Sequence, residues 1–260
     1  MAEEMYTGGQ YLHNCPTWHT EDSLWKGQEV LKMIRRNGLR PGTVCDVGCG
    51  AGEVLNQLYV NLPPDVQFVG YDISPQAYEL CRARQKDRLR FVLGSPLDDA
   101  NAMFDLVMAI DVFEHVEDYL GFLRKLLPKG RCHIFKIPLE LYALKIVMIS
   151  RIMAGRRDFG HLHYFAKETA LASLADTGYE IVDHFYASGV NEMPRTWAER
   201  LVKWPRRFLL AVAGDLGVRL LGGYSLVVLT RQPGQSLPAG DGDGGCQAAS
   251  RLERRRDSAV

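Results

Sequence analysis

The chain has 260 residues, of which 47% are hydrophobic and 24% charged, a composition typical of a soluble globular protein. Its 31 basic and 31 acidic residues cancel, which excludes the overall basic excess of many nucleic-acid-binding proteins, and we expect no nucleic-acid partner. The six cysteines form no Cys-x-x-Cys pair, which favours reduced thiols in a cytoplasmic protein over a disulfide framework or a zinc site.

Residues 1–42 predict a polar leader followed by an amphipathic helix. The first ten residues are acidic and polar, unlike a secretory signal. Residues 22–37 carry apolar side chains at helical spacing, and Gly38 ends the pattern. The intervening stretch is rich in aromatic residues, and Trp18 and His19 are candidates for a lid that folds over a ligand and excludes water. The alternative is that these aromatic residues only pack the first helix onto a sheet.

From residue 43 to residue 231, short apolar runs alternate with helical segments. Seven runs rich in Val, Ile, Phe or Leu predict strands at 43–47, 67–71, 89–93, 104–110, 131–137, 179–186 and 223–230. Helices are expected between the early strands, at 52–61, 75–85 and 116–127. This alternation predicts an α/β domain with a mostly parallel seven-stranded sheet, helices on both faces and an antiparallel last strand.

Two helical insertions near 139–165 and 194–222 interrupt the domain, and a tail follows it. In the first, we expect a helix over 139–153 and a loop over 154–165. In the second, the stretch 194–212 mixes tryptophans with basic residues, so it either contacts a membrane surface peripherally or covers a substrate pocket with a solvated basic face. Charged residues interrupt both insertions, which argues against a transmembrane span. The glycine-rich and arginine-rich residues 232–260 predict a disordered tail.

A glycine-rich loop follows the first strand. Gly48, Gly50 and Gly52 recur at alternate positions behind Asp46, and glycines permit a sharp turn and the close approach of a ligand. The loop begins at the carboxyl end of a parallel strand, where open α/β sheets bind their ligands. Asp72 ends the next strand, where an acid can accept hydrogen bonds from ribose hydroxyls. A dinucleotide-binding loop requires a third glycine at the position that Glu53 occupies, so another nucleoside is favoured over NAD.

The pattern Asp-x-Gly-x-Gly-x-Gly at 46–52 resembles motif I of the class I S-adenosylmethionine-dependent methyltransferases, which have a Rossmann-like fold. Residues 104–118 (FDLVMAIDVFEHVED) resemble motif IV of the subgroup that includes ubiquinone-biosynthesis O-methyltransferases and related bacterial small-molecule methyltransferases. The resemblance covers 43–138. It implies S-adenosylmethionine as cofactor, S-adenosylhomocysteine as product, and methyl transfer to a small-molecule acceptor, which we expect to be a hydroxyl oxygen on a sugar, a quinone-like ring or a lipid-linked intermediate.

The resemblance also implies which residues contact the cofactor. Glycine-loop residues would face its amino-acid part, Asp72 its ribose and Ile73 its adenine. Ser95 replaces the acid that commonly meets the adenine amino group, which leaves that contact to Ser95, to Asp98 or to backbone amides near Pro96. The implied set is Asp46, Gly48, Cys49, Gly50, Gly52, Asp72, Ile73, Ser95, Pro96, Ile110 and Asp111.

Histidines are the candidate catalytic groups, because a hydroxyl acceptor must lose its proton and histidine titrates near neutral pH. His115 follows the fourth strand, although Glu114 and His115 can instead cap the next helix. His161 and His163 alternate in the loop GHLHYF, so one can reach the substrate while the other makes a structural hydrogen bond. Because Glu114 and His115 lack further matched ligands, no metal is expected. An NAD-dependent oxidoreductase, or a protein that binds S-adenosylmethionine without catalysis, stays open as an alternative, and the sequence predicts no oligomeric state.

Overall fold

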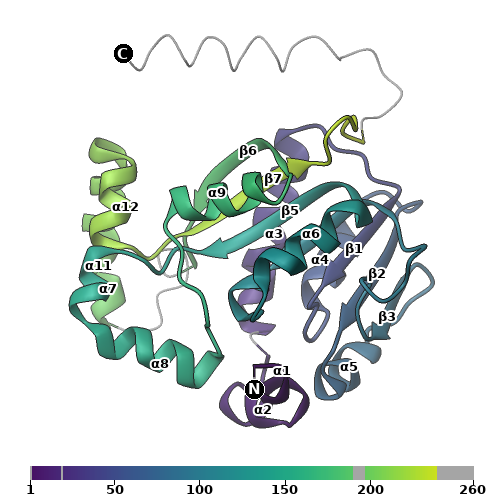
Figure 1. The fold of residues 1–260 in the computed structure, drawn as a ribbon, viewed down its shortest axis with the longest axis horizontal. Coiled ribbons are helices and arrows are strands. Elements are labelled where there is room, and N and C mark those ends of the chain that lie inside the picture. The colour runs from purple at the N-terminus through teal and green to yellow at the C-terminus, as the bar shows by residue number, and fades with distance from the viewer. Residues whose placement is uncertain (1, 19, 190–196, 239–260) are drawn as a thin grey trace.

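The protein is described from a computed structural model over residues 2–18, 20–189 and 197–238. A single sheet of seven strands forms its centre (Figure 1). The strands are β1 (Thr43–Val47), β2 (Gln67–Asp72), β3 (Leu89–Leu93), β4 (Phe104–Ile110), β5 (Gly130–Pro138), β6 (Glu180–Ala187) and β7 (Ser225–Arg231).

The strand order is β3-β2-β1-β4-β5-β7-β6. The first five strands pair in parallel, and β7 lies between β5 and β6, antiparallel to both. The predicted Rossmann-like sheet with an antiparallel last strand is therefore confirmed. In the register, Val47 lies between Tyr71 of β2 and Ala109 of β4, so the carboxyl ends of β1, β2 and β4 meet at one edge of the sheet.

Helices cover both faces of the sheet (Figure 1). Side chains of α3 (Thr20–Arg36), α4 (Glu53–Asn61) and α5 (Pro75–Arg82) pack with one set of strand residues. Side chains of α6 (Tyr119–Leu126) and α9 (Lys167–Asp176) pack with the alternate set. Val44 and Cys45 of β1 illustrate the division, because successive strand residues point to opposite faces and each joins a different core.

The two insertions form four helices at one end of the molecule (Figure 1). They are α7 (Ala143–Val147), α8 (Ile149–Phe159), α11 (Trp197–Ala213) and α12 (Asp215–Leu221). The predicted boundary in the first insertion was wrong, because the helix breaks at Met148 and then continues through Gly155 to Phe159. Gly160 ends it with a φ of 79°, and its amide group donates to the carbonyl oxygens of the preceding turn.

The two ends of the described chain are more ordered than the sequence predicts. The leader forms α1 (Ala2–Thr7) and α2 (Gln10–Asn14). Residues 232–238 were expected to be part of a disordered tail, but Leu237 packs against the core and the carbonyl oxygen of Pro238 accepts a 2.6 Å hydrogen bond from the amide of Arg40. Residues 239–260 lie outside the described part. Among the helices that the structure describes, none has the length and hydropathy needed to cross a membrane.

Candidate active site

The glycine loop joins β1 to α4, and the backbone conformation at three of its positions favours glycine. Gly48, Gly50 and Gly52 have φ angles of 71°, 54° and 77°, the left-handed region that residues with a Cβ rarely adopt. A Cβ on Gly52 would lie 2.5 Å from the Phe91 ring, and one on Gly48 would lie 2.9 Å from Val112. The sequence spacing therefore produces a loop whose backbone is held against the sheet edge.

Asp72 connects this loop to the end of β2. One carboxylate oxygen accepts the Gly50 amide at 2.8 Å and the other accepts the Ser74 amide at 2.9 Å. Each carboxylate oxygen has two lone pairs, so both keep capacity for a further donor such as a ribose hydroxyl. Ile73, next in the chain, lines the same cavity and is 42% exposed, which leaves an apolar surface available to a flat ring.

Asp46 lies buried beneath the loop, and its Oδ1 has no hydrogen-bond partner among the described residues. Burial and, second, the charge of Asp72 raise the pKa of Asp46 to about 8, although Lys26 opposes the shift. A buried carboxyl group without a donor is unfavourable. The ammonium group of an amino-acid ligand would supply the missing donor and charge.

Asp111 follows β4 and holds two lysines. Lys136 Nζ lies 2.6 Å and 2.7 Å from the two carboxylate oxygens, and Lys26 Nζ lies 3.0 Å away. Burial opposes ionisation of Asp111, but the charges of the two lysines outweigh it and lower its pKa. Asp111 has a φ of 55°, a strained value for a residue with a side chain. The ion pairs hold this residue in place against that strain.

Glu140 and His161 form a carboxylate–imidazole pair. Glu140 Oε2 lies 2.6 Å from His161 Nδ1, and Glu140 Oε1 accepts from Lys145. Burial by itself raises the pKa of Glu140, but the hydrogen bonds and charges of His161 and Lys145 lower it below its usual value. The ionised carboxylate orients the imidazole and leaves Nε2 as its other polar atom.

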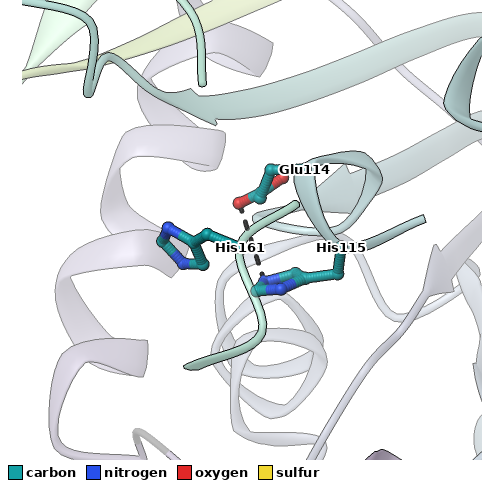
Figure 2. Close-up of side chains that lie close together, drawn as sticks. All are labelled: Glu114, His115 and His161. Carbon is teal, nitrogen blue, oxygen red and sulfur yellow. Dashed lines mark ion pairs between the residues drawn. The ribbon is translucent and has the colours of Figure 1, made fainter. Parts of the chain in front are cut away.

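His115 faces His161, with ring centroids 4.8 Å apart, and Glu114 lies beside both (Figure 2). His115 Nδ1 is 2.7 Å from the Tyr6 hydroxyl, and its Nε2 is 3.9 Å from Glu114 Oε1. Burial and then the nearby His161 lower the pKa of His115 to about 3, so the ring is neutral. The Glu114 carboxylate is fully buried without a hydrogen-bond partner in the described chain.

The ligand atoms of these three residues lie within 4.8 Å of one another, a geometry that can hold a metal ion. The expectation that the site uses no metal stays a prediction.

These groups share one cavity of about 860 Å³. Most of the predicted site residues line it, namely Trp18, Asp46, Gly48, Cys49, Gly50, Asp72, Ile73, Ile110, Asp111, His115 and His161. Gly52 supports the loop from outside the lining.

Three predicted residues lie elsewhere in the described structure. Ser95 Oγ accepts from the Leu97 amide at 3.2 Å, and Pro96 is buried beside it; neither lines the cavity, so their adenine contact stays a prediction. His163 does not line the cavity; its Nε2 lies 2.9 Å from the Val116 carbonyl oxygen and its ring packs on Tyr119. Its substrate contact stays a prediction. His19 lies outside the described residues.

Among the lining residues that the sequence analysis missed are Tyr6, Lys26, Lys136 and Glu140. One of these residues could have been identified from the sequence. Lys136 lies between Phe135 and Ile137 in the buried part of β5, and an ionised side chain inside a buried strand must have a partner. The others are unremarkable in sequence, because their partners are far away along the chain.

A family model described as a methyltransferase domain matches residues 45–128. This match, the curated relatives and the solved structures together support a class I S-adenosylmethionine-dependent methyltransferase, and the subgroup expected from residues 104–118 stays a prediction. This methyltransferase is 32% identical over 212 residues to the cyclopropane-fatty-acyl-phospholipid synthase of Escherichia coli (strain K12), an alignment that covers 76% of the chain and 51% of that protein. The chain therefore spans about half the length of the curated relatives it matches first.

Two solved structures show the same fold. The cyclopropane synthase MmaA2 from Mycobacterium tuberculosis has a TM-score of 0.56 at 17% identity, over 78% of the methyltransferase and 84% of that chain. Magnesium protoporphyrin IX methyltransferase from Synechocystis PCC 6803, with bound S-adenosylhomocysteine, has a TM-score of 0.53 at 17% identity, over 80% and 82%.

These findings support S-adenosylmethionine as the cofactor and disfavour the dinucleotide alternative. The residues of the chain fit this cofactor, because Gly48 and Gly50 line the cavity and the Asp46 oxygen, which has no hydrogen-bond partner among the described residues, can accept from the cofactor's ammonium group.

Proposed function

We propose that the chain transfers the methyl group of S-adenosylmethionine to a hydroxyl oxygen of a small lipid-linked or quinone-like acceptor. The observation that carries this proposal is the Glu140–His161 pair, which lines the same cavity as Asp46 and Asp72. When bound, S-adenosylmethionine supplies a methyl carbon attached to a sulfonium. Asp72 would hold the ribose and Asp46 the amino-acid end, while Tyr6, Tyr11 and Trp18 of the N-terminal segment would act as a lid that excludes water.

His161 is the proposed general base. Its Nδ1–H donates to the ionised Glu140, so Nε2 carries the lone pair that accepts the hydroxyl proton. Glu140 then stabilises the imidazolium that forms, as a carboxylate beside a catalytic histidine does. Glu140 is a positioning residue, because it acts through His161.

His115 is a weaker candidate for the base. Its pKa of about 3 means that the surroundings disfavour its protonated form, which a base must become. We propose that His115, held by Tyr6, forms the wall against which the acceptor and His161 are positioned.

The acceptor end of the cavity is largely apolar. Leu139, Tyr142, Phe159 and Tyr224 line it, together with the polar pair described above. Its volume of about 860 Å³ lies in the upper part of the range of small-molecule pockets, roughly 300–1,000 Å³. An acceptor with an apolar body and one hydroxyl near His161 fits these walls.

A second candidate is methylene transfer to a carbon–carbon double bond of a lipid acyl chain. The relative from Escherichia coli, whose name describes that chemistry, favours it, and so does the apolar lining. In both reactions a base must remove a proton, from the acceptor hydroxyl or from the transferred carbon, so the same pair serves both.

Deuterium-labelled S-adenosylmethionine separates the two reactions. The purified chain is incubated with the labelled donor and lipid, quinol and glycolipid fractions, and products are analysed by mass spectrometry. A hydroxyl acceptor keeps all the methyl deuterium, whereas cyclopropane formation loses one. Binding of S-adenosylhomocysteine without any labelled product from these fractions would instead favour a protein without catalysis.

The base is tested with His161→Gln and Glu140→Gln, and with His184→Gln as a matched control at an exposed histidine on β6. We expect His161→Gln to lower kcat roughly 10²–10⁴-fold with little change in affinity for S-adenosylhomocysteine. Glu140→Gln should lower kcat less and also shift the pH profile, which loss of packing alone would not do. Wild-type kcat in both variants would overturn the assignment.

A further inference from the structure

Exposed apolar side chains gather on the two insertions. Of the 19 large hydrophobic residues that are exposed in the described chain, 13 lie between residues 141 and 220. This segment includes α7, α8, α11 and α12, which form one end of the molecule, with α12 packed against both α7 and α11 (Figure 1). Single exposed apolar residues are ordinary on a protein surface, but a concentration on one end marks an interaction site.

Helix α11 carries the most pronounced part of this surface. Four residues recur every three or four positions and so lie along one stripe of the helix, namely Leu201, Trp204, Phe208 and Val212. They are between 62% and 70% exposed. Leu216 and Leu220 of α12 are also exposed, at 54% and 43%. No other part of the described structure therefore covers the stripe.

The charges that residues 201–213 place beside the stripe are positive. This segment contains no acid, and Lys203 and Arg207 flank Trp204 and Phe208, whereas the Arg206 guanidinium is buried and donates to the Leu221 carbonyl oxygen. The Arg207 guanidinium lies 5.8 Å from the centre of the Trp204 ring. Two more exposed arginines, Arg151 and Arg156, lie on α8. An amphipathic helix with tryptophan and phenylalanine on one side and lysine and arginine beside them is typical of a helix in the plane of a bilayer surface.

We propose that α11, supported by α12, α7 and α8, docks the protein on the surface of a bilayer that contains anionic lipids. The positive charge favours an anionic bilayer over a second copy of the chain as the partner of this surface. A symmetric contact through the stripe would bring the cations of both copies together. The docking itself does not depend on the reaction.

The consequence for the acceptor rests on the proposed function. Tyr142, Lys145 and Phe159 lie in or beside α7 and α8 and line the acceptor end of the cavity, as do Gly223 and Tyr224 directly after α12. The insertions that contact the bilayer thus also form the acceptor walls, so a lipid-linked acceptor reaches the site without leaving the membrane surface.

The test is co-sedimentation of the full chain with vesicles of phosphatidylcholine alone or mixed with phosphatidylglycerol. We expect binding to the mixed vesicles that weakens with added salt. The double variant Trp204→Ser/Phe208→Ser should bind at least about tenfold more weakly, because two large apolar side chains no longer enter the bilayer. The matched control is Val60→Ser/Met103→Ser, which removes two exposed apolar side chains outside the insertions and should leave binding unchanged.

Equal vesicle binding by the double variant and the wild type, or no binding to mixed vesicles, would overturn the proposal. So would light scattering that shows a dimer which Phe208→Ser separates, because the stripe would then belong to a second copy. Affinity for S-adenosylhomocysteine reports whether the variants are folded. Vesicle binding that persists while no acceptor is methylated would refute the proposed function and leave the docking surface standing.

Discussion

Replacing Asp72 by alanine is the sharpest test of how the cofactor is held. Both carboxylate oxygens of Asp72 retain capacity for a ribose hydroxyl after accepting the amides of Gly50 and Ser74. A hydrogen bond to a charged group contributes about 1.5–3 kcal/mol, so two bonds at the lower end contribute about 3 kcal/mol. Since about 1.4 kcal/mol is a factor of ten, Asp72→Ala should weaken S-adenosylhomocysteine binding roughly 100-fold.

This substitution should lower the stability of the fold less than it lowers the affinity for the ligand. Burial raises the pKa of Asp72 despite the two backbone amides, so removing the carboxylate also relieves an unfavourable desolvation. The lost acceptor for the amides of Gly50 and Ser74 opposes that gain. We therefore expect a small change in Tm beside a large loss of affinity.

Isothermal titration of S-adenosylhomocysteine into wild type, Asp72→Ala and Asp72→Asn measures the effect. The asparagine keeps one acceptor oxygen and should fall between the other two. Asp65→Asn, an exposed aspartate before β2, is the matched control. Unchanged affinity in a folded Asp72→Ala protein would show that the ribose is held elsewhere and refute the reasoning.

Three further outcomes are expected. Tyr6→Phe removes the hydroxyl that contacts His115 and the Phe159 carbonyl oxygen, at about 1 kcal/mol for each bond. S-adenosylhomocysteine should therefore bind up to roughly 30-fold more weakly, and amide exchange should rise in α1 and α2. Unaltered amide exchange in these helices would contradict the lid. Asp46 has a pKa of about 8 against 3.8 in the unfolded chain, so the folded state favours the protonated form and the ligand-free protein should lose stability as pH rises from about 4 to 8. Asp46→Asn should flatten that slope in Tm and be the more stable protein at pH 8, whereas parallel curves would contradict the shift. Treatment with a chelator should leave turnover unchanged, and recovery of lost activity by added Mn²⁺ or Co²⁺ would show that the cluster in Figure 2 binds a metal.

The strands could be predicted closely because their signal is local. Apolar runs bounded by turn residues predict β1, β3 and β4 with the bounds that the structure has, and the others differ by one or two residues at an end. The first insertion was less predictable. Its sequence contains two glycines, and nothing local distinguishes their roles. Gly155 lies within helix α8, whereas Gly160 ends that helix with a left-handed backbone.

The position of β7 also needed tertiary structure. Its sequence predicts an apolar strand, but its place between β5 and β6 follows from long-range pairing. Val227 of β7 pairs with Lys136 of β5 on one side and with Phe185 of β6 on the other. Similarly, Leu237 belongs to the core only because the chain after β7 returns to the sheet.

The sequence by itself determined the methyl donor, because that information lies in neighbouring residues. The glycine spacing behind Asp46 and the acid at the end of β2 define a nucleoside site at one sheet edge, wherever the rest of the chain goes. Only the tertiary structure decided what surrounds the acceptor. Glu140 contacts His161, which is 21 residues away in the sequence, and Tyr6 contacts His115, which is 109 residues away. Such contacts produce no periodic pattern in a single sequence.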